Sequence, residues 1–157
     1  TGKIGYYYGS LQITDINSDS QISILSPVDK SQIVTREEKI SNIDDIYAYS
    51  KIGSLVTLHN LTVYDYNDSQ NNSATTLKCH YIDENGNQKQ FNVRIAKEIA
   101  LYDPITKKQI SSGEYFIGKT FETITGMLAY YNGAVKTPYR NGHMQLALSS
   151  MDDVIFK

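Results

Sequence analysis

One nine-residue pattern occurs twice in the chain and limits what the chain can fold into. Residues 1–9 read TGKIGYYYG and residues 125–133 read TGMLAYYNG. Each copy has Thr-Gly, a strand-like stretch that ends in Tyr-Tyr, one further residue and Gly. A second short strand follows each copy, at 11–13 and at 144–146, so we interpret both as β-hairpins. Because a lone hairpin cannot bury its apolar face, each hairpin needs further strands.

The two copies differ in what comes before them. A long strand-rich stretch precedes the second copy and could complete a barrel, whereas nothing precedes the first. We therefore expect residues 1–27 to be the terminal hairpin of an upstream copy, 28–40 a linker, and 41–157 one complete module. The chain then resembles a piece of a tandem array. The alternative is that two tyrosine-rich hairpins arose by chance.

Composition favours a strand-rich globular protein and excludes several functions. The chain has 157 residues with 13 Tyr, no Trp and 3 Pro, and it is 40% hydrophobic and 20% charged, which excludes disorder. A net charge of −2 excludes a strongly basic nucleic-acid binder. One cysteine cannot form an internal disulfide, three histidines leave little material for a metal site, and no apolar run is long enough to span a bilayer.

Alternating apolar and polar residues predict the strands of the complete module. The apolar phase of the first strand changes near Asn60, which indicates a bulge that would let this strand serve two sheets. The next two strands flank the Asn-Gly turn at 83–87. Helix is minor: a capped segment from Ser41 ending before Gly53, and at most a short helix at 96–101. The predicted strands are 54–66, 74–82, 89–95, 120–131, 143–148 and 154–156.

Three meandering strands, an irregular connector and a final hairpin are typical of the OB fold. We therefore predict an all-β protein, a five-stranded OB-type Greek-key barrel preceded by a β-hairpin remnant of an upstream copy. A β-sandwich with immunoglobulin-like layering is the runner-up. It lacks the Cys…Trp…Cys signature and would need more evenly spaced strands.

The chemistry-bearing residues have simpler structural interpretations. Cys79 and His80 are adjacent in a strand and face opposite sides, so they cannot share a ligand, and Cys79 is expected in the core. Oxygen-bearing residues at 65–72 could hold Ca²⁺, but a solvated loop is the preferred interpretation. Three carboxylate pairs suit helix or turn positions, and we expect no catalytic residue, no metal site and no cofactor. These pairs are Glu37-Glu38, Asp44-Asp45 and Asp152-Asp153.

The order of turns and strands in the second part of the chain also resembles a known family. The match covers about residues 40–157 and lies in 53–58, 118–120, 124–128, 130–133, 144–146 and 152–155. These stretches resemble OB-like modules of bacterial secreted or surface multidomain proteins, often found beside endonuclease/exonuclease/phosphatase-type nuclease domains. The resemblance implies accessory binding of nucleic acid or another polymer, and it supplies no active-site residues.

OB geometry places a ligand across the second and third strands and the flanking loops. The outward residues of 74–82 and 89–95 are polar and cationic, and none of them is aromatic. Aromatic groups that stack on bases would therefore come from loops: Tyr64 and Tyr66 before the loop at 67–73, and Tyr139 in the insertion at 134–142. The predicted ligand-binding residues are Lys78, His80, Asn92, Arg94, Tyr66, Tyr139 and Arg140.

The sequence thus predicts a non-catalytic binding module of a larger secreted or cell-surface bacterial protein. It would bind single-stranded nucleic acid, or a polysaccharide or protein partner, weakly and without membrane insertion. Phosphate contacts would make binding salt-sensitive, whereas a carbohydrate or protein partner would show little salt dependence. Two alternatives stay open: a protein-interaction or structural spacer domain, and the accessory domain of a nuclease whose catalytic domain lies elsewhere.

Overall fold

A computed structural model gives the structure of the protein. Two compact units make up the chain, one of residues 35–129 with 144–157 and the other of residues 1–34 with 130–143, and each is described by itself. The predicted helix from Ser41 and the insertion at 134–142 lie outside the described residues. The structure describes residues 3–7, 10–16, 18, 23, 35–37, 51–69, 74–131 and 143–157.

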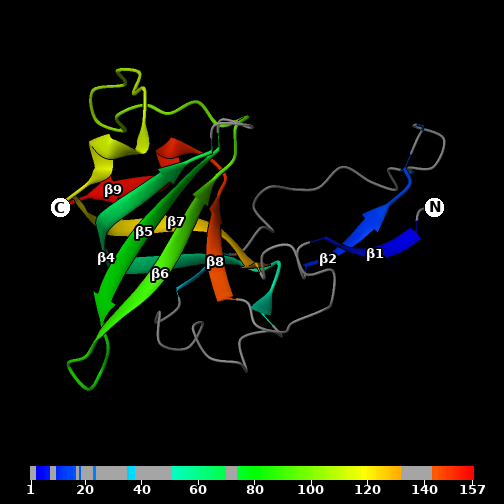
Figure 1. Ribbon diagram of the computed structural model, residues 1–157, viewed down its shortest axis with the longest axis horizontal. Coiled ribbons are helices and arrows are strands. Elements are labelled where there is room, and N and C mark those ends of the chain that lie inside the picture. The colour runs from blue at the N-terminus through cyan, green and yellow to red at the C-terminus, as the bar shows by residue number, and fades with distance from the viewer. Residues whose placement is uncertain are drawn as a thin grey trace. The chain divides into compact units, whose positions relative to one another are not determined.

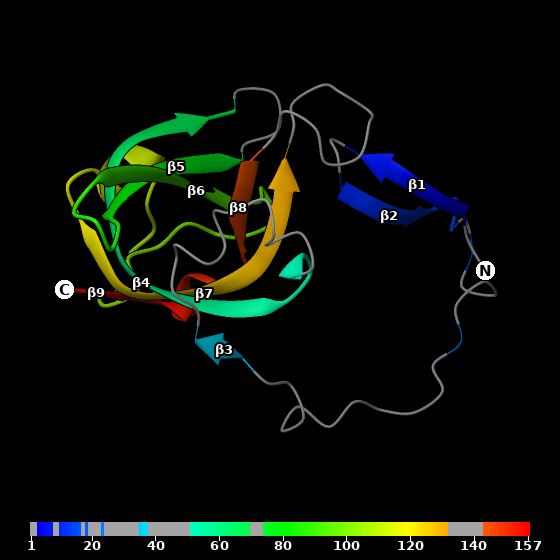
Figure 2. The same ribbon diagram turned by 90° about the horizontal axis from the view of Figure 1, so that it is seen from below.

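A closed five-stranded barrel forms the larger unit (Figure 2). Its strands follow the order β4-β5-β6-β8-β7, and β7 pairs with β4 again to close the ring. β6 and β8 are parallel, whereas β4–β5, β5–β6 and β4–β7 are antiparallel. This arrangement confirms the predicted OB-type Greek-key barrel. The strands are β4 (Leu55–Asp68), β5 (Thr75–Ile82), β6 (Gln88–Ile95), β7 (Thr120–Tyr131) and β8 (His143–Leu148).

β4 is long enough to pair with two neighbours in succession. Its first part pairs with β7 and its last part with β5, and the two ladders meet at Thr62. Asn60 has a φ of 59°, at the predicted change of apolar phase. The register shift against β5 falls later, between Val63 and Asp65. Two hydroxyl pairs tie β4 to β7, Thr57–Thr125 at 2.8 Å and Thr62–Thr120 at 2.9 Å.

Alternating side chains of the five strands fill the barrel interior. Leu58, Leu77 and Val93 are 0–1% exposed, as the alternation predicts. The connector at 96–119 holds a turn at its start, where Ile99 N–H donates to the Ala96 carbonyl, rather than the short helix considered for 96–101.

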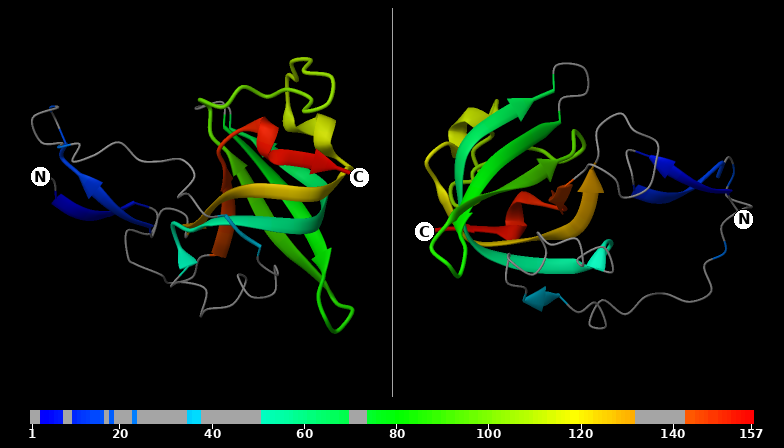
Figure 3. Two further views of the ribbon diagram at one scale, coloured as in Figure 1. Left: turned by 180° about the vertical axis from the view of Figure 1, so that it is seen from behind. Right: turned by 60° about the horizontal axis from the view of Figure 1, so that its bottom comes forward.

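A 3₁₀ helix that the sequence did not predict packs against the barrel. It is η5 (Gly113–Phe116), and the Ser112 side chain accepts a hydrogen bond from Glu114 N–H at its start. Phe116 is fully buried and contacts the rings of Phe121 and Phe156. The remaining elements of this unit are β3 (Arg36–Glu37), parallel to β4, η6 (Met151–Asp153) and β9 (Val154–Phe156), antiparallel to β7 (Figure 3).

In the other unit, β1 (Lys3–Tyr7) and β2 (Ser10–Thr14) form an antiparallel hairpin, drawn in blue in Figure 1. This confirms the predicted hairpin. Ile4 and Ile13 are directly opposite each other across the two strands, and their side chains are 75% and 68% exposed. The origin of the hairpin as part of an upstream copy stays a prediction.

Candidate ligand-binding surface

β5 and β6 lie side by side in the barrel (Figure 1). Their polar side chains point away from the barrel core. Lys78 is directly opposite Asn92, and His80 is opposite Gln90. The intervening residues are buried, which fixes the direction of the polar ones. The structure therefore brings four of the sequence-predicted residues, Lys78, His80, Asn92 and Arg94, onto one face. We call this face the β5–β6 outer face, and its members are Thr76, Lys78, His80, Gln90, Asn92 and Arg94.

Lys78 forms an ion pair with a carboxylate of the neighbouring strand. Its Nζ lies 2.6 Å from Asp65 Oδ2, and both side chains are close to half exposed. The hydrogen bond between them raises the pKa of Lys78 and lowers the pKa of Asp65. Asp65 therefore neutralises part of the positive charge of this face.

Arg94 lies on β6 opposite Thr76 and donates from Nη1 to Thr76 Oγ1 at 3.0 Å. This bond uses one of the five guanidinium N–H groups. A partly exposed arginine can present its planar group to phosphate or carboxylate.

Tyr64 supplies an aromatic ring beside this face. Its ring centroid lies 6.0 Å from that of His80, and the two planes are tilted by 36°. Tyr64 is 38% exposed, and His80 Nδ1 is buried without a hydrogen-bond partner among the described residues. Tyr64 was predicted as one of the rings before the loop at 67–73, and it lies on β4, within the predicted strand 54–66.

Tyr66, also predicted as a ligand contact, does not join this surface. It pairs with Leu77, whose side chain is buried in the barrel, whereas Asp65 pairs with the outward Lys78. The Tyr66 ring borders η5 closely: a Cβ added at Gly113 would lie 2.9 Å from Tyr66 Cδ2. The other two predicted contacts, Tyr139 and Arg140, lie outside the described residues.

Two carboxylates of the oxygen-rich stretch at 65–72, Asp65 and Asp68, bind different partners, and residues 70–73 lie outside the described residues. Asp65 faces outward to Lys78, whereas Asp68 accepts hydrogen bonds from Thr75 Oγ1 at 2.6 Å and from the Gly113 N–H group. These two carboxylates are therefore committed to different partners. Across the described part of the chain, no group of three or more His, Cys, Asp or Glu residues is placed to hold a metal ion.

A second polar cluster lies in the connector between β6 and β7. Asp103 accepts hydrogen bonds from the Tyr115 hydroxyl and from two backbone N–H groups, those of Ile105 and Thr106. The hydrogen bond from Tyr115 is the main cause that lowers the pKa of Asp103 to about 2, and the same bond raises the pKa of Tyr115 to about 12. Lys119 Nζ lies 3.1 Å from the centroid of the Tyr115 ring.

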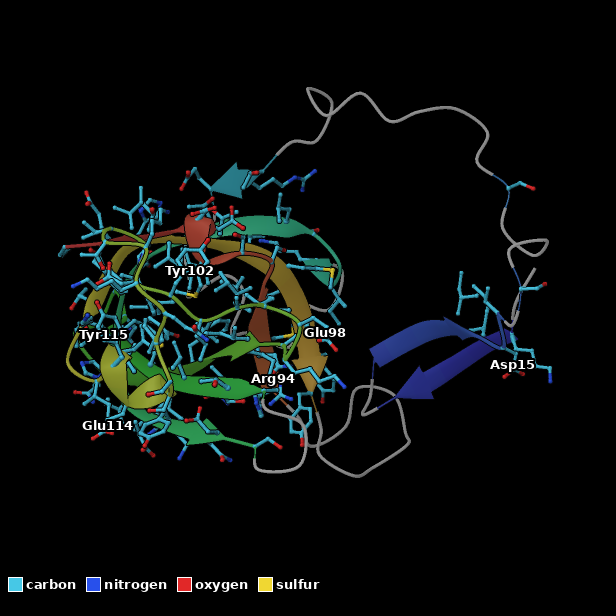
Figure 4. The ribbon with its side chains drawn as sticks, turned by 90° about the horizontal axis from the view of Figure 1, so that it is seen from above. Asp15, Arg94, Glu98, Tyr102, Glu114 and Tyr115 are labelled. Atoms are coloured by element: carbon cyan, nitrogen blue, oxygen red, sulfur yellow. The ribbon has the colours of Figure 1, made fainter. Side chains whose placement is uncertain are left out.

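An open cavity of about 630 Å³ adjoins this cluster, with Asp103 and Tyr115 in its wall. Figure 4 shows Tyr115 and Glu114 on the side of the barrel away from Arg94. Because the Tyr115 hydroxyl donates to the Asp103 carboxylate, we interpret the cluster as a structural element that holds the connector in place. Sequence reasoning described this segment only as an irregular connector. A signal was nevertheless present in the sequence. An Asp side chain commonly accepts hydrogen bonds from backbone N–H groups two and three residues later, as Asp103 does from Ile105 and Thr106.

Several of the remaining candidate groups have structural roles in the described ranges, whereas Glu38 and the Asp44-Asp45 pair lie outside the described residues. Burial raises the pKa of the Cys79 thiol to about 12, as expected for a core residue, and His80 faces the other way. Asp152 binds Lys107 at 2.6 Å and lies in η6 with Asp153. No helix within the described ranges is long and apolar enough to cross a membrane.

Comparison of this chain with protein-family models, with curated protein sequences and with solved structures found no match.

Proposed function

We propose that this chain is a non-catalytic binding module that holds single-stranded nucleic acid weakly across the β5–β6 outer face. The observation that carries this is a row of side chains along β5 and its partner strand. It begins at the Tyr64–His80 ring pair, continues with Lys78 and ends at Arg94, which is opposite Thr76. Successive outward positions on a strand are about 6.6–6.8 Å apart. An extended single strand of nucleic acid could therefore stack one base on the Tyr64 and His80 rings and place phosphates at Lys78 and Arg94.

The charges of this surface indicate weak binding. Lys78 and Arg94 are its two cations, and Asp65 offsets part of the charge of Lys78. Each phosphate contact on a single strand contributes about −0.7 to the slope of log affinity against log salt. Two contacts give a slope of about −1.4, so raising salt from about 50 to about 200 mM should weaken binding about sevenfold.

The test is a titration of a labelled single-stranded oligonucleotide with the full chain at low and high salt. Arg94→Gln and Lys78→Gln should each weaken binding and lower the salt slope by about 0.7. Asp65→Asn should strengthen binding, because it frees Lys78 from its ion pair. Lys108→Gln removes an exposed cation of the connector instead and serves as the matched control, with no change expected.

The ring pair gives a separate arm of the same titration. Base stacking on one aromatic side chain is worth about 1–3 kcal/mol, so Tyr64→Ala should weaken binding by at least about fivefold. Oligonucleotide binding that is lost in Tyr64→Ala but does not depend on salt would show that ring stacking, not phosphate contact, holds the strand. Absence of binding at low salt, or binding unchanged in the Arg94→Gln, Lys78→Gln double variant, would show that the nucleic-acid proposal is wrong. A protein-interaction or spacer role would then remain.

We also propose that the module belongs to a larger secreted or cell-surface polypeptide, in which it is an accessory to other domains, a nuclease domain among the candidates. The resemblance in the turn and strand pattern supports this placement.

A further inference from the structure

The β1–β2 hairpin exposes its apolar cross-strand pair. Ile4 is directly opposite Ile13, and both side chains are mostly exposed, at 75% and 68%. Ile16, just after the hairpin, is 44% exposed as well. A two-stranded hairpin with bare isoleucines is marginal by itself in water.

The barrel shows what covers the same two positions in the second copy of the pattern. The repeat aligns Ile4 with Leu128 of β7 and Ile13 with Leu146 of β8. Both leucines are 0% exposed. The same hairpin positions are therefore fully buried in one copy and bare in the other.

The two copies of the pattern also share a glycine two residues before the aligned apolar position. A Cβ added at Gly126 would lie 2.6 Å from the Ala147 carbonyl oxygen and 2.9 Å from Leu146 Cγ, so the position requires glycine. The sequence has Gly2 at the matching position. Such a close approach belongs to the strongly coiled strands of a small barrel.

The barrel also shows which strands complete the hairpin. β7 pairs with β4 along Thr120–Met127, and β8 pairs in parallel with β6. In the first copy, the position that matches Met127 is Lys3, and the positions that match residues 120–124 come before Thr1. Among the described residues, β1 and β2 pair with each other alone, so the equivalent partners are one strand antiparallel to β1 and one strand parallel to β2.

We propose that the β1–β2 hairpin is the closing hairpin of a second OB-type barrel. Its occupant is a three-stranded meander equivalent to β4–β6, supplied by polypeptide joined ahead of Thr1, which buries Ile4 and Ile13. The chain then carries one complete barrel and part of a second. This inference is independent of nucleic-acid binding at the β5–β6 outer face.

The test extends the full chain with its own barrel strands. A copy of residues 51–124 is joined directly ahead of Thr1. This junction keeps the barrel's own sequence order, because Thr1 aligns with Thr125, the residue that follows 124. Amide hydrogen exchange of Lys3–Tyr7 and Ser10–Thr14 should slow by about 100-fold or more relative to the unextended chain, because the hairpin joins a cooperative unit. Amides of β5 and β6 in the original barrel report whether the chain is folded.

Two variants of the extended chain are the matched controls. Deleting the last residue of the copied segment shifts the strand register by one residue, so that the apolar side chains of the copied segment face solvent. The slowing of hairpin amide exchange should then disappear. Ile4→Asp with Ile13→Asp should also abolish it while the original barrel stays protected.

Three results would overturn the proposal. The first is equal hairpin exchange with and without the extension while the original barrel is protected. The second is equal protection in the slipped extension. The third is a dimer of the unextended chain in sedimentation equilibrium that Ile4→Asp dissociates, which would make a second copy the occupant.

Discussion

A single carboxylate, that of Asp103, organises much of the connector between β6 and β7. It accepts two backbone N–H groups of the following turn and the hydroxyl of Tyr115, which lies on η5. Tyr115 in turn lies beneath the Lys119 ammonium group. This bonding joins residues that a flexible connector would leave apart, and it makes the connector sensitive to the ionisation of two groups.

We expect the Asp103–Tyr115 pair to make stability depend on pH at both extremes. The pKa of Asp103 is lowered from 3.8 to about 2, so its contribution is present above about pH 4 and is lost as pH falls towards 2. The pKa of Tyr115 is raised from 10 to about 12, so its contribution is present below about pH 10 and is lost as pH rises towards 12. Thermal unfolding midpoints of the wild type, Asp103→Asn and Tyr115→Phe measure both effects.

The difference in midpoint between wild type and Asp103→Asn should shrink below about pH 4, and that between wild type and Tyr115→Phe should shrink above about pH 10. Differences that stay constant across both ranges would contradict the pairing.

β4 contains a residue whose backbone conformation most residue types adopt only at a cost. Asn60 has a φ of 59°, in the left-handed region that glycine and asparagine adopt at low cost. We expect Asn60→Gly to leave the free energy of unfolding nearly unchanged and Asn60→Val to lower it by about 1–2 kcal/mol. Urea unfolding measures both. Because Asn60 is exposed, the two substitutions differ little in buried contacts. An equal decrease in the free energy of unfolding in both variants would show that the asparagine side chain, and not the backbone conformation, is responsible.

The sequence predicted the regular strands closely because alternation alone sets which side chains are buried. The predicted bounds 120–131, 143–148 and 154–156 agree with the structure, and so does the turn that joins β5 to β6. Tyr64 and Tyr66 could not be assigned in this way. A one-residue register shift between Val63 and Asp65 places two residues of equal parity on different sides of the strand.

The 3₁₀ helix η5 was missed for a different reason. It follows Ser111-Ser112, which together with Gly113 resembles a loop, and a four-residue helix has no apolar periodicity to detect. Its position depends on tertiary packing, since Phe116 is buried against Phe121 and Phe156 and Gly113 fits closely against Tyr66 and Thr75. For the candidate surface, sequence alternation was sufficient for Lys78 and Arg94, but the Asp65 ion pair required the fold.

At the scale of the molecule, the two copies of the repeat should respond differently to the same truncation. Leu128→Ala removes a fully buried side chain of the barrel and should cost about 2–5 kcal/mol of unfolding free energy. Ile4→Ala, at the matching exposed position, should change it by less than about 0.5 kcal/mol. Chemical denaturation followed by barrel signals measures both. A loss in Ile4→Ala as large as that in Leu128→Ala would show that the hairpin already supports the barrel in this chain.

The two hydroxyl pairs between β4 and β7 have a consequence for how quickly the protein folds. They join residues that are 68 and 58 positions apart in the sequence, whereas β5 and β6 meet across a short turn. Bringing distant strands together lowers the conformational entropy of the chain before the contacts that offset this loss have formed. We therefore expect the β5–β6 hairpin to form early and closure of the ring at Thr57 and Thr62 to be the slow step. Until that step, the open edges of β4 and β7 are available to other chains, so the time needed to close the ring sets the period during which the protein is exposed to aggregation.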